Sequence, residues 1–147
     1  MMVVVTVAEE PWDAPASADL RAELTAELDE RYDGVDTPER TEPIVVFVVA
    51  RAADGTPVGC GGLQRSGPAE TEVVELYVAP EARGTGTARI ILRALENRAR
   101  DAGLTLVGLT LGTRQPDAMR FLERHGYRRV PTMNSEQVRY TRAVADG

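Results

Sequence analysis

Short hydrophobic segments alternate with longer amphipathic ones along this chain, and the two patterns predict strands and helices respectively. The short segments are rich in Val, Ile and Leu and are bounded by Gly, Pro or Asp, which is typical of strands. They are residues 2–7, 44–50, 58–63, 73–78 and 104–111, with a closing pair at 127–130 and 137–142. We therefore expect a β-sheet at the centre of the fold.

Three segments have the period of an amphipathic helix. The first starts at Ser17 as N-cap, ends near Gly34, and carries its apolar face on Leu20, Leu24, Leu28 and Tyr32. In the second, the apolar face is formed by Ala88, Ile91, Leu92, Leu95, Ala99 and Ala102. Its other face carries Arg89, Arg93, Glu96, Asn97 and Arg100, and Gly103 follows as the cap. The third starts at Pro116, ends at Gly126, and turns Ala118, Phe121, Leu122 and His125 inward.

The connections predict how the strands pair. Asp54-Gly55 is a hairpin turn, so the strands on either side should be antiparallel. The strand at 73–78 is followed by a helix and then by the strand at 104–111, which predicts a parallel pair with a right-handed crossover. Ligands of open α/β sheets bind outside the C-terminal ends of such strands. We expect the site there.

The turn between the strand at 73–78 and the following helix carries Arg83, Gly84 and Gly86. Glycine lets the main chain adopt positive φ and approach a ligand closely. The first N–H groups of the helix lie at the positive end of its dipole, which favours a phosphate. The turn therefore predicts a phosphate-bearing ligand, against the alternative of an ordinary strand-to-helix connection.

Two common nucleotide-binding motifs are excluded at this turn. A Walker A loop needs Lys followed by Ser or Thr, which the turn lacks. A dinucleotide fingerprint needs a third glycine where Arg89 stands, and an acidic residue about 20 positions later.

Length and charge narrow the class of protein. The 147 residues suit one domain, spanning 1–147, with a substantial core. A formal net charge of −6 disfavours nucleic acid, which is bound through Lys and Arg, and suits a cationic amine better. No segment approaches the roughly 20 apolar residues that span a membrane.

Cys60 is the single cysteine, so we expect neither an intrachain disulfide nor a cysteine-based metal site, and we expect a cytoplasmic protein. Cys60 lies within the strand at 58–63, where a small buried residue is a simpler interpretation than a nucleophile. Gly59, Gly61 and Gly62 in the same strand predict a bulge or a close backbone approach.

At this point the sequence resembles the GNAT family, the GCN5-related N-acetyltransferases. Residues 83–88, Arg-Gly-Thr-Gly-Thr-Ala, fit the Arg/Gln-x-x-Gly-x-Gly/Ala signature of that family, and 76–80 resemble the strand before it. Residues 114–127 look like its second landmark, an Asn-x-x-Ala helix that ends in Gly-Phe or Gly-Tyr. The resemblance covers the chain from about Ile44 onward.

The resemblance implies an α/β (α+β) fold with a mixed, mostly antiparallel sheet, a parallel pair joined by the cofactor-binding helix, and helices on both faces. It also implies transfer of an acetyl group from acetyl-CoA to a primary amine of a small molecule or peptide, without a metal. Dimers are common in the family, so a homodimer stays open. By the same resemblance, the co-substrate would be held by Leu76, Tyr77, Val78, Arg83, Gly84, Thr85, Gly86, Thr87, Ala88, Arg89 and Gln115.

Transfer to an amine needs a base, because an amine with a pKa of about 10 is protonated at neutral pH. Glu72 resembles the base of some family members, whereas a solvent-facing or salt-bridged strand glutamate is the competing interpretation. Strand alternation would turn Glu75 to the opposite face.

The general acid is not identified. The position that often carries a tyrosine in the family is Leu122, and the usual Asn is Gln115. Tyr77, Tyr127 and Tyr140 are possible substitutes, each weighed against a role in the core. His125 suits a helix-end charge better than catalysis. Because of Leu122, a non-catalytic acyl-CoA-binding module or sensor is the alternative function, and an interaction domain that has lost the ligand is a third.

Overall fold

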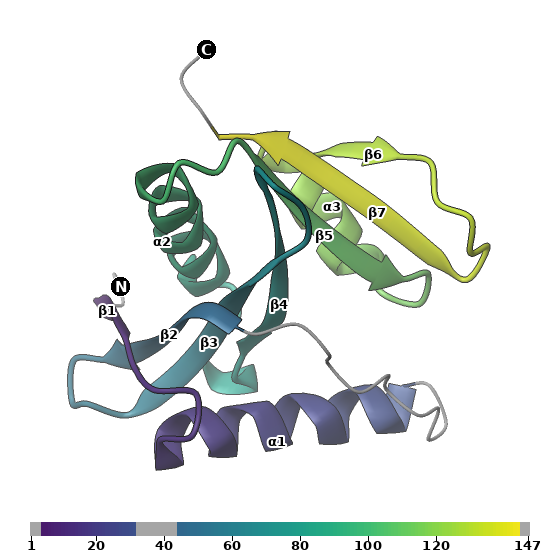
Figure 1. Cartoon of the computed structure of the whole chain (residues 1–147). Helices are drawn as coiled ribbons and strands as arrows, with labels where there is room; N and C mark the ends of the chain where they lie inside the picture. The colour runs from purple at the N-terminus through teal and green to yellow at the C-terminus, as the bar shows by residue number, and fades with distance from the viewer. Residues whose placement is uncertain (1–3, 32–43, 145–147) are drawn as a thin grey trace.

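The computed structural model describes residues 4–31 and 44–144 (Figure 1). Seven strands form one sheet in the order β1-β2-β3-β4-β5-β7-β6. The strands are β1 (Val5–Glu9), β2 (Ile44–Ala52), β3 (Pro57–Arg65), β4 (Glu70–Val78), β5 (Leu106–Gly112), β6 (Arg128–Val130) and β7 (Gln137–Ala143). The helices are α1 (Pro15–Arg31), the 3-10 turn η1 (Pro80–Ala82), α2 (Thr87–Asp101) and α3 (Pro116–Arg124).

Strand pairing agrees with the predicted topology. The pair β4–β5 is parallel and is connected through α2, whereas every other neighbouring pair is antiparallel. The turn at Asp54-Gly55 joins β2 to β3, and β6 and β7 form the closing pair. The mixed, mostly antiparallel α/β fold is confirmed.

Helices cover both faces of the sheet, and β2 shows the reason. Phe47 and Val49 pack into the cluster of α1, while Val48 and Ala50 pack into the larger cluster of α2. Successive side chains of a strand point to opposite faces, so this apolar strand is buried on both sides. Figure 1 shows α1 and α2 on opposite sides of the sheet.

The prediction of Ser17 as an N-cap is wrong. Helix α1 already begins at Pro15, and Ser17 lies fully buried in its first turn. Proline fits the first helical position because its fixed φ suits the helix and its missing N–H would have had no partner there. The predicted end near Gly34 lies outside the described residues, as do residues 2 and 3 of the first predicted strand.

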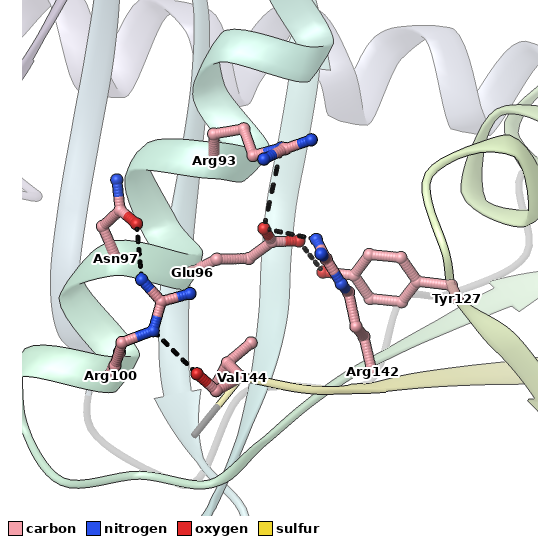
Figure 2. A network of polar contacts seen from close by, with 7 residues as sticks. All are labelled: Arg93, Glu96, Asn97, Arg100, Tyr127, Arg142 and Val144. Atoms are coloured by element: carbon pink, nitrogen blue, oxygen red, sulfur yellow. Dashed lines mark hydrogen bonds and ion pairs between the residues drawn. The ribbon is translucent and has the colours of Figure 1, made fainter. Parts of the chain in front are cut away.

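The helical period places Glu96 on the polar face of α2, and this prediction too is wrong. The residue is only 2% exposed and is one of the buried residues of the helix. The Tyr127 hydroxyl and the Arg142 guanidinium each donate a hydrogen bond of 2.8 Å to the carboxylate (Figure 2). A carboxylate with hydrogen-bonding and charged partners can be buried. The helical period of α2 does not reveal such partners, because they come from elements far along the chain.

None of the helices in the described ranges is long and apolar enough to cross a bilayer.

Candidate active site

The strands β4 and β5 pair over a short distance and then separate. Their paired residues end at Glu72 and Gly108, although β4 continues to Val78 and β5 to Gly112. A cavity of about 290 Å³ lies beyond that last pair. Its described walls are residues 73–76 of β4, residues 109–111 of β5, Gln115, Ala118, Phe121 and Leu122 of the α3 segment, and Leu24, Thr25 and Leu28 of α1.

A bulge interrupts β4 beside this cavity. Gly62 pairs with Val74 and Cys60 with Tyr77, so three steps along β4 match two along β3. Glu75 takes a left-handed backbone conformation with φ of 55° there, and its carbonyl accepts a hydrogen bond from the Cys60 thiol at 3.3 Å. Bulges re-aim side chains next to active sites. The bulge breaks the strict alternation from which the direction of Glu75 was predicted, although Glu72 and Glu75 still do not line the same cavity.

Glu72 and Glu75 of β4 have different surroundings. Glu75 lines the cavity and is the one ionisable residue among its described lining residues. Glu72 lies outside that lining and forms an ion pair with Arg139 of β7. The salt-bridged alternative for Glu72 is thus what the structure shows, while its role as a base stays a prediction.

The glycine turn opens onto a second cavity, of about 340 Å³. Gly84 and Gly86 have φ of 78° and 85°, and a Cβ added to either would meet no atom within 4 Å. Gly86 is the N-cap of α2 and contributes no side-chain cap. The first N–H groups of a helix have no partner inside it, so a space for an anion lies before exposed main-chain donors.

Three arginines and one histidine line this second cavity. Arg83, Arg89, Arg124 and His125 line it together with the glycines. Burial lowers the pKa of His125, and the positive charges of Arg89 and Arg124 lower it further. The guanidinium groups of Arg83, Arg89 and Arg124 line the cavity with positive charge, which favours a phosphate. Sequence reasoning missed Arg124 and His125, whose signal is two basic residues at the end of the helix that follows β5.

Arg83 has partners of its own. Its guanidinium donates to the carbonyl of Val78 at 2.9 Å and forms an ion pair of 2.6 Å with Glu27 of α1. The Thr85 hydroxyl contacts the carbonyl of Ala82 and lies 2.9 Å from the hydroxyl of Thr87. These contacts of Arg83 and Thr85 stabilise the conformation of the glycine turn.

The other predicted binding residues divide between the two cavities. Leu76 and Gln115 line the first, and Val78, Thr87, Ala88 and Arg89 line the second. Tyr77 lies outside both linings and is buried in the apolar cluster of α1. Phe121 lines both cavities. The two spaces therefore border the same side chain of α3, one on the side of the glycine turn and one at the gap between β4 and β5.

The tyrosines considered as general acids are engaged elsewhere. Leu122 is buried at 1% exposure and presents an apolar side chain to the first cavity. The Tyr127 hydroxyl donates to Glu96, and the Tyr140 hydroxyl donates to Glu123 at 2.7 Å. Burial and the Glu96 carboxylate raise the pKa of Tyr127. These two tyrosines therefore hold the core together.

The residues from the first strand to the end of the α3 region, 5–127, match the family model described as the Acetyltransferase (GNAT) family. The chain belongs to the GNAT family. The resemblance seen in the glycine turn and in the α3 helix is thereby confirmed, and the protein is a member of an acetyltransferase family.

Individual relatives agree with this assignment. The GNAT chain is 32% identical over 129 residues to an "IAA acetyltransferase" of Azospirillum brasilense, with 84% of each chain covered. A candidate acyl-CoA N-acyltransferase from Klebsiella pneumoniae superposes with a TM-score of 0.81 at 24% identity, over 96% of this chain and 98% of that one. The PaiA N-acetyltransferase of Thermoplasma acidophilum, in complex with coenzyme A, has a TM-score of 0.72 at 15% identity, over 95% and 99%. The two structural similarities show the fold.

Within residues 4–31 and 44–144, no group of three or more His, Cys, Asp or Glu could hold a metal ion. Metal-free chemistry stays a prediction.

Proposed function

We propose that this GNAT protein transfers an acetyl group from acetyl-CoA to a primary amine of a small molecule or peptide. The observation that carries the proposal is that two cavities border the same side chain, Phe121. The arginine-lined cavity at the glycine turn suits a diphosphate, and the largely apolar cavity between β4 and β5 suits the pantetheine arm and its thioester. The related fold of the Thermoplasma protein, which holds coenzyme A, supports the same assignment.

The residues of the two cavities suit the parts of this co-substrate. Main-chain donors at 84–89, with Arg89, Arg124 and His125 nearby, would hold the diphosphate. Val78 of β4 and Phe121 line the way to the first cavity, where Leu76 and Gln115 would border the arm. Bound there, acetyl-CoA supplies an activated acetyl group whose thiolate is a tolerable leaving group.

The reaction proposed is direct transfer in a ternary complex. The amine nitrogen forms a bond to the acetyl carbonyl carbon, and the bond between that carbon and sulfur breaks. The nitrogen gives up a proton, and coenzyme A leaves as the thiol, so the atoms and charges balance. We assign the general base to Glu75 because its residue lines the cavity beside the bulge, directly or through a water. The assignment of Glu72 stays a competing prediction.

A second candidate function is a non-catalytic acyl-CoA-binding module. The observation that favours it is Leu122, whose apolar side chain stands in the cavity where a hydroxyl acid often lies in the family. It predicts co-substrate binding without transfer.

Two measurements separate these functions. Acetyl-CoA at about 100 times its dissociation constant should stabilise the protein by about 2.7 kcal/mol, seen as a raised melting temperature. Adding a panel of primary amines should then release free thiol in a saturable way. A thermal shift without thiol release across the panel would favour the binding module, and no thermal shift would overturn both functions.

The remaining expectations accompany this proposal. We propose that one acetyltransferase domain spans 1–147 and acts in the cytoplasm, on small-molecule or peptide amines rather than on nucleic acid or a membrane. A homodimer is compatible with it.

A further inference from the structure

His125 is the single histidine of the chain and is the C-cap of α3, where it borders the cavity at the glycine turn. Its imidazole packs against the ring of Phe121, one helical turn earlier, with ring centres 4.5 Å apart. Gly84 and Gly86 line the same cavity. The imidazole therefore stands beside the space proposed for the diphosphate.

Positive charges outnumber negative ones around this imidazole. Among the described residues, those whose charge acts on it are three arginines and one glutamate: Arg89, Arg93 and Glu96 of α2 and Arg124 of α3. The Glu96 carboxylate is already paired, 2.8 Å from Arg142 of β7 and 4.0 Å from Arg93 (Figure 2). Arg83 lines the cavity from the glycine turn as well. The described surroundings of His125 therefore carry a net positive charge.

Without an anion, the neutral form of His125 is favoured. Burial of the imidazole and the positive charges of Arg89, Arg124 and Arg93 disfavour an imidazolium, and the pKa of His125 is lowered from its ordinary value. The helix dipole at the end of α3 and the Glu96 carboxylate act in the opposite direction but are outweighed. At pH 7 the imidazole is therefore mostly neutral.

A bound diphosphate would reverse this balance. A negative charge within about 4–6 Å favours the positively charged form of a neighbouring base, and a protonated imidazole has a donor on each ring nitrogen for phosphate oxygens. The pKa of His125 should then be higher in the complex than in the free protein. When a pKa rises on binding, the complex holds a proton that the free protein lacks, so the ligand binds more tightly as the pH falls through that range.

We propose that His125 takes up a proton when the diphosphate of acetyl-CoA binds, and that this proton makes the affinity for the co-substrate rise from pH 8 to pH 6. The inference rests on the proposed function and adds to it a dependence of the same site on pH. The gain in affinity is complete below the pKa of His125 in the free protein and is lost as the pH rises through its pKa in the complex.

Because the chain has one histidine, the proposal can be tested directly on the unmodified protein, prepared without a histidine tag. The imidazole C–H signal in proton NMR is followed against pH, first in the free protein and then with saturating CoA. The midpoint should lie below the ordinary value for histidine in the free protein and should move to higher pH in the complex. An unchanged midpoint, or one that moves to lower pH, would overturn the proposal.

Calorimetry measures the consequence for affinity. The probe is 3′-dephospho-CoA, which keeps the diphosphate but lacks the 3′-phosphate, a monoester whose own second pKa is about 6. Its dissociation constant should be at least threefold lower at pH 6 than at pH 8. At pH 6.5, titrations in two buffers with different enthalpies of ionisation should show uptake of protons on binding. A constant dissociation constant without proton uptake would contradict the inference.

Two substitutions fix the charge at this position. His125→Gln stays neutral, so it should show no proton uptake, and its dissociation constants at pH 6 and pH 8 should agree within twofold. His125→Arg stays positive, so it should also lose the pH dependence but bind 3′-dephospho-CoA more tightly than His125→Gln at pH 8. A pH dependence that persists in both variants would assign the proton to another group and overturn the role of His125.

The failures are distinguishable. If neither CoA nor 3′-dephospho-CoA binds at any pH, the proposed function fails and the inference fails with it. If both bind and amines release thiol, while the affinity is independent of the protonation of His125, the proposed function stands and only the proton uptake is wrong.

Discussion

Glu72 of β4 and Arg139 of β7 form an ion pair that spans the strand between them. The Arg139 Nε atom donates to the Glu72 carboxylate at 3.0 Å. The two side chains meet over Gly108 of β5, where an added Cβ would come within 2.6 Å of both of them. Glu72 and Gly108 are also the last paired residues before β4 and β5 separate. The pair therefore joins three strands at the point where the cavity begins.

Glu75 lines the cavity and Glu72 is ion-paired with Arg139, so removing each negative charge should have a different effect. Glu75→Gln should lower kcat/KM at neutral pH by about 100-fold or more, because positioned bases contribute at least that much. The loss should shrink at high pH, where the amine is neutral without help. Steady-state kinetics across pH would measure it.

Glu72→Gln is the matched comparison. It should reduce the free energy of unfolding by about 1–3 kcal/mol, through the unpaired Arg139, and change kcat/KM far less than Glu75→Gln does. The reverse pattern, with turnover lost at Glu72 and retained at Glu75, would restore Glu72 as the base.

Alanine at Gly84 or Gly86 should weaken binding of acetyl-CoA. Both residues have positive φ and face open space, so a Cβ would strain the turn and enter the space proposed for the diphosphate. We expect the KM for acetyl-CoA to rise at least tenfold with a smaller change in kcat. Gly55→Ala is the control, because Gly55 has φ of 90° with equally open space but lies in the β2–β3 turn. A similar KM for all three variants would contradict the proposed site.

Breaking the buried network around Glu96 should destabilise the fold. The carboxylate links α2 to Tyr127, which directly follows the α3 segment, and to Arg142 of β7 (Figure 2). Glu96→Ala leaves the Arg142 charge and the Tyr127 hydroxyl without this partner, so unfolding in urea should show a loss of about 3–5 kcal/mol. Arg93→Ala removes a half-exposed partner 4.0 Å away and should cost less than about 1 kcal/mol. Equal losses would contradict a buried network.

Stability should fall at alkaline pH because Cys60 keeps its proton in the folded state. Burial, with the Glu75 charge, raises the pKa of the thiol from 9.0 to about 12. Between these values the unfolded chain loses a proton that the folded chain retains, so the free energy of unfolding decreases by about 1.4 kcal/mol per pH unit. Denaturation should show little slope from this thiol at pH 8 and should approach the full slope as the pH rises from 9 to 10. Cys60→Ala should flatten it between pH 9 and 10, and an unchanged slope would contradict the burial of the thiol.

Local sequence determined the helices and strands of this protein and the conformation of the glycine turn at residues 83–86. The Val-rich segments form strands, as their composition predicts. Gly84 and Gly86 adopt positive φ, which glycine does without strain. The glycines of β3 predicted a bulge or a close approach, and an added Cβ at Gly59 or Gly61 would indeed come within 3 Å of side chains of α2, whereas the extra residue of the bulge described above lies in β4. These features depend on neighbours within a few residues.

Tertiary structure alone decided which carboxylate faces the cavity. One extra residue in β4 changes the direction of the side chains after Val74. The Glu72 carboxylate is paired with Arg139, which lies 67 residues away in the sequence. Likewise, the burial of Glu96 depends on its hydrogen bonds with Tyr127 and Arg142. Arg124 and His125 line the cavity at the glycine turn only because the fold places the end of α3 beside that turn. Periodicity describes one element at a time, whereas a charge is buried or paired by groups that only the folded chain brings to it.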